Sequence, residues 1–306
     1  MKQLSKEDLN YIEFQLYNKA RDVDVAIYNA IMDPTAKEFV IDSLYLYLTK
    51  EGGIGSALEI DNYNPNASVY QTYEALRILS DLGFDKHYNN DLFVQLVNKI
   101  GNYLFNRQEL IDGLWNPLVP SNDKYAHSEE YNYTANPFPI WGVHPTAAIL
   151  GYILELMPDT KAYYKKALKQ IGFVFSKLDE EKDWNTYAFI SYSALLRSLK
   201  KTGLFQEECY KIEQRIKLEA MKHLEEEDFN FPLYLMDVEV DQVLQEKIDA
   251  YLDRIMDSRA SHGLWENKKA WGSNRYPEAD SAGLKWIGAR SVWNLYLLKA
   301  YGRIEE

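Results

Sequence analysis

Four pairs of segments with one shared pattern constrain the fold of this 306-residue chain more than any other feature. In each pair an amphipathic segment is followed by a turn or loop, and then by a second segment that is apolar on several sides. Repeats of this kind bury their apolar faces against one another and determine the whole architecture. The pairs are residues 39–55 with 68–83, 96–115 with 144–156, 167–184 with 185–203, and 247–265 with 288–302.

The second segment of the first pair explains why helical hairpins are predicted. Ala75, Leu76, Leu79 and Leu82 recur at helical spacing, and Gly83 stands where a helix C-cap is expected. A helix that is apolar on several sides must be covered on more than one side. We therefore expect the second helix of each hairpin to lie inside and the first to lie outside.

Two further helices are predicted at residues 6–32 and 205–227, so that the chain holds about ten to twelve helices. The expected fold is all-α, and the expected architecture is a ring of helical hairpins, an α/α toroid, in a single domain over residues 1–306. An open solenoid of helix pairs requires the same pattern and is the alternative.

Three long loops favour the ring over the solenoid. They lie near residues 56–66, 116–143 and 266–287 and make the repeat length irregular, whereas solenoid repeats are regular. Long loops in a compact domain are usually functional. We expect them to gather at one end of the ring, over a central cavity.

Composition excludes several classes of protein. The 15 Gly and 10 Pro are too few for an all-β sandwich, and the net charge of −12 argues against nucleic acid and anionic membranes as partners. No run of about 18 apolar residues is present, so no membrane span is expected. The N-terminal residues mix charges and lack the apolar core of a signal peptide, which predicts a cytoplasmic protein.

Motifs for metals and common cofactors are missing from the sequence. The single cysteine, Cys209, cannot form an intramolecular disulfide or a thiolate zinc cage, and no His stands at ligand spacing from it. There is no DDxxD run for a magnesium diphosphate, no GxxxxGK[ST] phosphate loop and no GxSxG nucleophile elbow. The sequence therefore predicts neither a metal site nor a cofactor.

Two stretches end alike, YLFNRQELIDGLW and YLDRIMDSRASHGLW. The first, with Gln108, Gly113 and Trp115, resembles the glutamine-tryptophan repeat of squalene and terpenoid cyclases, and the second keeps Gly263 and Trp265 without the glutamine. In that family the Gln and Trp fasten the outer helix to the following turn. The resemblance thus implies a structural role for these residues, at the point where each hairpin turns inward.

A second resemblance covers most of the chain. The stretches GGIGSALEID at residues 52–61, DGLWNPLVPSNDKYAHSEEY at 112–131 and the C-terminal part from HGLWENKKAWG onward are similar to a group of bacterial proteins of the prenyltransferase and squalene-cyclase type of α/α toroid. This resemblance implies the fold. It assigns no catalytic residue, because the group has no established activity.

The sequence departs from the active cyclases at their catalytic acid. Where those enzymes carry a DxDD run at the start of an inner helix, this chain reads GVHPTA, with His144 and Pro145. An imidazolium titrates near pH 6.5 and does not match the activated carboxylic acid that a bare alkene requires, so ordinary alkene protonation is not expected. His144 stays a candidate catalytic residue, although Pro145 in the first helical turn also fits simple helix initiation.

Three other side chains are candidates for proton transfer. Glu59 and Asp61 are two residues apart in a loop before an inner helix, as in a general acid/base pair or a cation site; alternatively they are solvated loop acids. His127 lies in the longest loop, where it can shuttle protons or orient a polar ligand, or be an exposed loop residue. Tyr131 and Tyr133 follow it as candidate substrate-binding residues.

Aromatic side chains are the broadest signal of a binding site. Trp115 and Trp265 are accounted for by the repeat, and Trp184 is what remains of a third copy. Trp184, Trp271 and Trp286 are candidates to stack on a sugar ring or to stabilise a carbocation, although many aromatic residues must simply be core.

Positive charge accumulates near the last inner helix. Arg275, Lys285 and Arg290 stand close to Glu278 and Asp280. Arg290 is a candidate to bind a carboxylate or phosphate of a substrate, and salt bridges to the two acids are the alternative use of these cations.

The resemblance favours a cyclase-like or prenyltransferase-like protein that binds an apolar or isoprenoid-type small molecule in its cavity, with the usual acid and zinc site missing. A carbohydrate-active enzyme, a glycoside hydrolase or lyase, is the first alternative, because α/α toroids also host such enzymes and the loops are rich in Asn, Tyr and His. A noncatalytic ligand-binding protein is the second.

Overall fold

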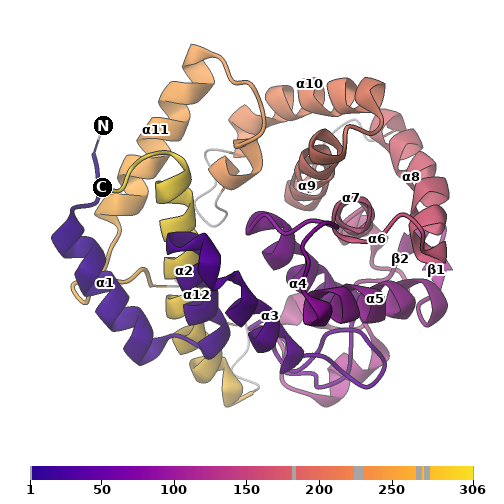
Figure 1. Ribbon diagram of the computed structural model, residues 1–306, viewed down its shortest axis with the longest axis horizontal. Coiled ribbons are helices and arrows are strands. Elements are labelled where there is room, and N and C mark those ends of the chain that lie inside the picture. The colour runs from indigo at the N-terminus through magenta and orange to yellow at the C-terminus, as the bar shows by residue number, and fades with distance from the viewer. Residues whose placement is uncertain (1, 181–183, 224–230, 267–270, 272–275, 306) are drawn as a thin grey trace. The chain divides into compact units, whose positions relative to one another are not determined.

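The computed structural model describes residues 2–180, 184–223, 231–266, 271 and 276–305. The chain divides into two compact units, of which unit 1 consists of Met1–Ser43 with Ala220–Glu306 and unit 2 of Leu44–Glu219. The described residues form twelve α-helices and one small antiparallel hairpin, which confirms the all-α prediction (Figure 1). None of the described helices is both long and apolar enough to cross a membrane.

Unit 2 contains most of the predicted hairpins. Its helices and strands are α4 (Val69–Asp81), α5 (Asp91–Asn106), β1 (Leu110–Ile111), β2 (Leu114–Trp115), α6 (Phe138–Trp141), α7 (Thr146–Leu156), α8 (Ala162–Glu180) and α9 (Thr186–Thr202), with the 3₁₀ turns η2 (Pro120–Lys124) and η3 (Glu129–Tyr131) in the longest loop. Helices α3 (Lys37–Tyr45) and α10 (Gln206–His223) each begin in one unit and end in the other.

The inner and outer layers predicted from the repeats are present in unit 2. Helix α7 packs against α4, α8 and α9, and every one of its residues is buried. Helices α5 and α8, the amphipathic members of their pairs, pack against each other on the outside (Figure 1). In unit 2 the second helix of each pair is therefore the more buried one, as its apolar faces predict.

A buried carboxylate ties the three inner helices together at one end. Glu155 accepts hydrogen bonds from Ser80 and Ser198, both at 2.7 Å, and from the ammonium of Lys201 at 2.6 Å. These residues lie in the last turns of α7, α4 and α9, so the three helices run parallel. Their first turns consequently lie together at the opposite end of unit 2.

Unit 1 is built from the two ends of the chain. It contains α1 (Lys6–Lys19), α2 (Asp22–Met32), η1 (Pro34–Ala36), η4 (Phe231–Leu235), α11 (Gln242–Asp257) and α12 (Glu278–Ala300). Helix α12 packs against α1 and α2. Gly288 makes the close approach possible, because a Cβ there would stand only 2.6 Å from the Cβ of Ala20.

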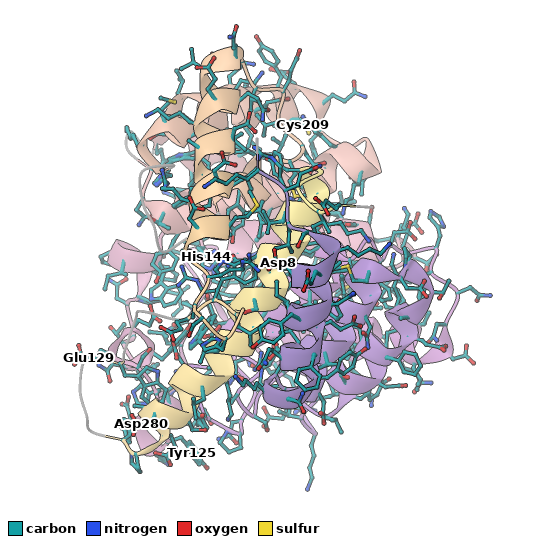
Figure 2. All side chains as sticks on the ribbon, turned by 90° about the vertical axis from the view of Figure 1, so that its left-hand side faces the viewer. Asp8, Tyr125, Glu129, His144, Cys209 and Asp280 are labelled. Atoms are coloured by element: carbon teal, nitrogen blue, oxygen red, sulfur yellow. The ribbon has the colours of Figure 1, made fainter. Side chains whose placement is uncertain are left out.

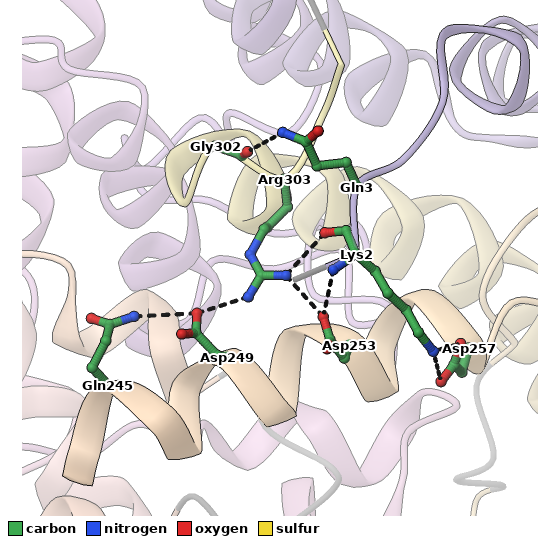
Figure 3. Close-up of polar contacts among 8 residues, drawn as sticks. All are labelled: Lys2, Gln3, Gln245, Asp249, Asp253, Asp257, Gly302 and Arg303. Carbon is green, nitrogen blue, oxygen red and sulfur yellow. Dashed lines mark hydrogen bonds and ion pairs between the residues drawn. The ribbon is translucent and has the colours of Figure 1, made fainter. Parts of the chain in front are cut away.

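The two termini are joined within unit 1. Leu4 and Ile304 form a parallel β-bridge, and the guanidinium of Arg303 lies buried between them and α11. It donates to the carbonyl of Lys2 at 2.9 Å and to Asp253 and Asp249 at 2.8 and 2.7 Å (Figure 3). One buried cation thus pairs with two acids and connects the N-terminal and C-terminal segments of unit 1.

Two helix boundaries differ from the prediction. The single helix predicted at residues 6–32 is two helices, because Ala20 and Arg21 are extended and the side chain of Arg21 pairs with Asp24 at the start of α2. Helix α12 begins at Glu278 rather than at 288, because Gly283 is accommodated inside the helix.

Candidate functional site

Two loops of unit 2 are held together by buried amides. The side chain of Asn64 donates to Asn122 at 2.8 Å, and Asn122 in turn donates to the carbonyl of Tyr131 at 3.0 Å. Gln71, on α4, accepts from the backbone of Leu58 at 3.1 Å. Buried amides that are satisfied in this way fix one arrangement of the chain. The loops at residues 55–67 and 116–143 are therefore connected to each other and to the first turn of α4.

The first of these loops contains a strained turn. Ser56 and Ala57 have φ angles of 60° and 63°, a left-handed conformation that costs a side-chain-bearing residue about 1–3 kcal/mol. The turn is held because the Ser56 N–H donates to the carbonyl of Asn64 at 2.9 Å. It is followed directly by Glu59 and Asp61.

Both predicted acids are buried by this loop. Glu59 is 6% exposed and Asp61 8%, and the backbone N–H of Asp61 donates to Glu59 Oε1 at 3.3 Å. Burial, together with the negative charges of Glu74, Asp61 and Glu130, raises the pKa of Glu59 well above its usual value. The environment of Glu59 thus favours its protonated, neutral form more than that of an ordinary carboxyl group.

A third acid, Glu130, comes from the second loop. It accepts a hydrogen bond from the Tyr187 hydroxyl at 3.3 Å and from Ser128 at 3.4 Å. Burial raises the pKa of Tyr187 and Tyr131 above the usual phenol value, and the nearby carboxylates raise it further. These phenols therefore stay neutral, and that of Tyr187 is the hydrogen-bond donor to Glu130.

Four aromatic residues of unit 2 pack beside these acids; we call them the aromatic cluster. Trp141 stacks on Tyr187 with ring centres 4.6 Å apart, and Tyr70 meets Trp141 and Tyr131 edge-on at 5.2 and 5.4 Å. Trp141 and Tyr131 are buried against Leu118, while Tyr70 and Tyr187 remain partly exposed. The exposed parts of Tyr70 and Tyr187 leave aromatic surface open to a ligand beside the acids.

His144 lies next to the aromatic cluster, immediately before α7. Its ring is parallel to those of Trp141 and Tyr187, and Nδ1 lies 3.0 Å from the hydroxyl of Ser191 on α9. The side chain is 2% exposed, and Nε2 has no hydrogen-bond partner among the described residues. Burial lowers the pKa of His144 to about 3. The imidazole is therefore neutral near pH 7. Pro145 stands at the N-cap position of α7, one residue before the first helical position where the sequence placed it.

His127 is buried in the second loop rather than exposed on it. Nδ1 lies 2.7 Å from the carbonyl of Tyr125 and Nε2 3.0 Å from Asn132 Oδ1. Its backbone also forms a β-bridge with Asn62. Because both ring nitrogens are engaged within the loop, the geometry favours a role in fixing the loop over proton transfer to a ligand.

The remaining candidates of unit 2 are dispersed. Tyr133 is 36% exposed, and its backbone N–H donates to Asp123 at 3.0 Å. Trp184 is buried, stacked on Tyr192 with 4.6 Å between ring centres, and the Arg215 guanidinium lies 5.5 Å from its ring centre. These contacts connect Trp184 to α9 and α10.

The other substrate-binding candidates belong to unit 1. Trp271 is buried with its ring centre 6.3 Å from that of Tyr276, and Trp286 and Arg290 are half-buried on α12. Arg275 lies outside the described residues.

The sequence interpretation missed Tyr70, Tyr187 and Ser191. The first two occupy the same position, two residues after the N-cap of an inner helix, where Ser68 caps α4 and Asn185 caps α9. That shared position was the available signal, since parallel inner helices bring their first turns together. Ser191 carried no signal, because a serine inside an apolar helix is uninformative until its neighbour is known.

The described residues contain no group of three or more His, Cys, Asp or Glu side chains placed to hold a metal ion. No family model matches the chain, and no match was found among curated proteins or solved structures.

Proposed function

We propose that the chain is a carbohydrate-active enzyme, a glycoside hydrolase or lyase, whose catalytic acid is Glu59. The observation that carries this proposal is a buried carboxyl group of raised pKa, next to further carboxylates and to partly exposed aromatic rings. Cleavage of a glycosidic bond needs one protonated carboxylic acid and one ionised carboxylate. Environments that separate the pKa values of neighbouring acids supply this pair.

The roles follow from the contacts. Glu59 protonates the glycosidic oxygen as its bond to the anomeric carbon breaks. The carboxylate of Asp61 or Glu130 then either attacks that carbon or removes a proton from the attacking water. Tyr187 and Tyr70 offer ring faces on which the apolar face of a sugar can stack. This chemistry requires no cofactor.

The ring-shaped architecture predicted from the repeats is part of the proposal. It is supported by the parallel inner helices of unit 2, whose first turns bring Tyr70, His144 and Tyr187 together with the two long loops. In a toroid, loops that gather at one end of the inner helices would place these residues at the mouth of the central cavity.

The test is turnover of a panel of oligosaccharides by the wild-type chain and by Glu59→Gln. The variant is nearly isosteric but cannot donate the proton, so kcat should fall about 10²- to 10⁴-fold. Glu129→Gln, an exposed neighbour of Glu130 (Figure 2), is the matched control and should keep full activity. Activity of the wild type should decline as the pH rises through the raised pKa of Glu59. Full activity of Glu59→Gln, or no turnover of any saccharide, would contradict the proposal.

A second candidate is the binding of an isoprenoid-type apolar ligand. It is favoured by one observation, the packing of three rings of the aromatic cluster, Tyr70, Trp141 and Tyr187, against a neutral imidazole, because such rings stabilise carbocations. Mass spectrometry of the purified chain for a bound polyprenyl compound tests it. Binding of either ligand class without turnover would identify a noncatalytic binding protein.

A further inference from the structure

The charges around Glu59 favour one kind of ligand. Glu74, Asp61 and Glu130 are the charges that act most strongly on its carboxyl group, and all three are negative. Glu74 pairs with Arg77 at 2.8 Å on α4, whereas Asp61 and Glu130 reach the site from the two loops. Such an arrangement attracts a positive charge more strongly than a neutral or negative group.

The aromatic cluster offers a complementary surface for a cation. The hydroxyl of Tyr187 is bonded to Glu130, and its ring is stacked on Trp141, so the carboxylate stands at the edge of an aromatic face. Tyr70 lies against the same Trp141 ring and is likewise only partly buried. An ammonium group is bound well by a carboxylate on one side and by aromatic faces on the other.

His144 is an observation that does not depend on the acids. Nδ1 is turned to Ser191 on α9, so Nε2 stands on the opposite edge of the ring, on the side away from that hydroxyl. This buried nitrogen, packed against Trp141 and Tyr187, has no hydrogen-bond partner in the described part of the chain. A neutral imidazole does not repel a cation, and a ligand hydroxyl or amine can satisfy its free nitrogen.

We propose that the ligand is an amino sugar with a free, protonated amine, which binds between Glu130 and the faces of Tyr70 and Tyr187. Nε2 of His144 contributes a hydrogen bond to a neighbouring group of the same sugar. This inference rests on the proposed function and narrows its substrate to cationic saccharides.

The experiment compares three β-1,4-linked tetramers by calorimetric titration of the full chain: glucosamine, N-acetylglucosamine and glucose. They share a backbone, but only the first carries ammonium groups. The glucosamine tetramer should bind at least about tenfold more tightly than either neutral one, as expected for a desolvated cation on aromatic faces.

Substitutions at Glu130 and Tyr187 test whether the preference for the glucosamine tetramer arises at the proposed amine site. Glu130→Gln should abolish the preference for the glucosamine tetramer, whereas Glu129→Gln, the exposed neighbour, should retain it. Tyr187→Leu removes the ring and should also reduce the preference, while Tyr187→Phe keeps the ring and should reduce it less. Thermal unfolding of each variant shows that it is folded. Because two substitutions test the same site independently, one unfolded variant does not decide the outcome.

The possible results separate the two proposals. Equal affinity for the three tetramers would overturn the amino-sugar inference and leave a carbohydrate-active enzyme standing. Retained selectivity in both Glu130→Gln and Tyr187→Leu would place the amine elsewhere and overturn the site. Absence of binding and turnover with every saccharide would overturn the proposed function together with the inference.

Discussion

The turn that ends at Trp115 in unit 2 and the turn that ends at Trp265 in unit 1 are built alike. The indole N–H of Trp115 donates to the carbonyl of Leu104, in the last turn of α5, at 3.1 Å. The indole of Trp265 donates to Ile255, in the last turn of α11, at 2.7 Å. In both turns the indole fastens the preceding helix.

The backbone of each tryptophan makes a second equivalent contact. The N–H of Trp115 donates to the hydroxyl of Thr146 at 2.9 Å, and that of Trp265 to the hydroxyl of Ser291 at 3.0 Å. Each turn also contains a glycine with positive φ two residues earlier, at +77° in Gly113 and +84° in Gly263. The repeated sequence ending is thus a repeated set of contacts.

The two turns differ in what surrounds the contact on the inner helix. Thr146 is the first residue of α7, whereas Ser291 lies in the middle of α12. In unit 2 a long loop with buried polar groups precedes this point, whereas in unit 1 the residues from Glu278 to Arg290 form further turns of helix. The turn fixes which residue of the inner helix contacts the tryptophan backbone. It does not fix the structure of the residues before that contact, and in unit 2 those residues contribute to the candidate site.

The largest expected effect tests whether the two turns are equally important. Trp115→Ala and Trp265→Ala should each lower the free energy of unfolding by about 3–5 kcal/mol, because each leaves a cavity and an unpaired carbonyl. Denaturant unfolding followed by circular dichroism measures both. A loss below about 1 kcal/mol in either variant would break the equivalence.

A smaller effect tests the second contact. Thr146→Val and Ser291→Ala each leave a buried backbone N–H without its acceptor, which should cost about 1–3 kcal/mol. Thr202→Val is the control, since its hydroxyl only donates to carbonyls of its own helix and the cost should stay near 0.5 kcal/mol. If the control loses as much stability as the other two, the tryptophan contact is not the cause.

The smallest effect concerns pH and should distinguish the turns. His144 has a pKa near 3 when folded and 6.5 when unfolded, so its contribution to stability is lost as the pH falls through this window. Glu59 has a raised pKa when folded and 4.5 when unfolded, so its contribution is lost as the pH rises above 4.5. Each slope is at most about 1.4 kcal/mol per pH unit, and the two oppose each other above pH 4.5 while the pH stays below both 6.5 and the raised pKa of Glu59.

Two variants and a local probe separate the opposing contributions of His144 and Glu59 to the pH dependence of stability. In Glu59→Gln the stability of unit 2 should rise with pH between 4.5 and 6.5, and in His144→Gln it should fall as the pH rises from 4.5 toward the raised pKa of Glu59. Hydrogen exchange at the backbone N–H of Trp115, corrected for the intrinsic pH dependence, reports unit 2, and the N–H of Trp265 reports unit 1. The same response at both amides would show that the pH dependence does not arise in the candidate site.

Helix boundaries could be predicted only where the residues that decide them are local. The end of α9 at Gly203 and the N-caps Ser68 and Asn185 follow from sequence, because their hydrogen bonds lie within one turn. The early start of α12 could not be predicted from sequence, since Gly283 and Gly288 have low helix propensity. Only the packing of α12 against α1 and α2 offsets this low propensity. Tertiary contacts outweighed local preference there.

For the candidate site, the sequence identified the two acids but not the environment that surrounds them. Glu59 and Asp61 were found from their spacing, but the burial that raises the pKa of Glu59 comes from a network of Asn62, Asn64 and Asn122 across two loops. Such pairings depend on long-range geometry and leave no periodic pattern in the sequence. The role of His127 in fixing its loop was hidden for the same reason.

The way the chain runs through the two units has a consequence for its synthesis. Unit 2 is one uninterrupted stretch, whereas unit 1 requires residues from both ends, with Arg303 joining α11 to Lys2. On the ribosome, unit 2 can therefore acquire its structure while the polypeptide is still growing, but the N-terminal helices must wait for the final residues before their partners exist. Unit 1 can close only after α12 and Arg303 have emerged from the ribosome, and nascent chains stalled before that point should expose α1 and α2 to chaperones and proteases.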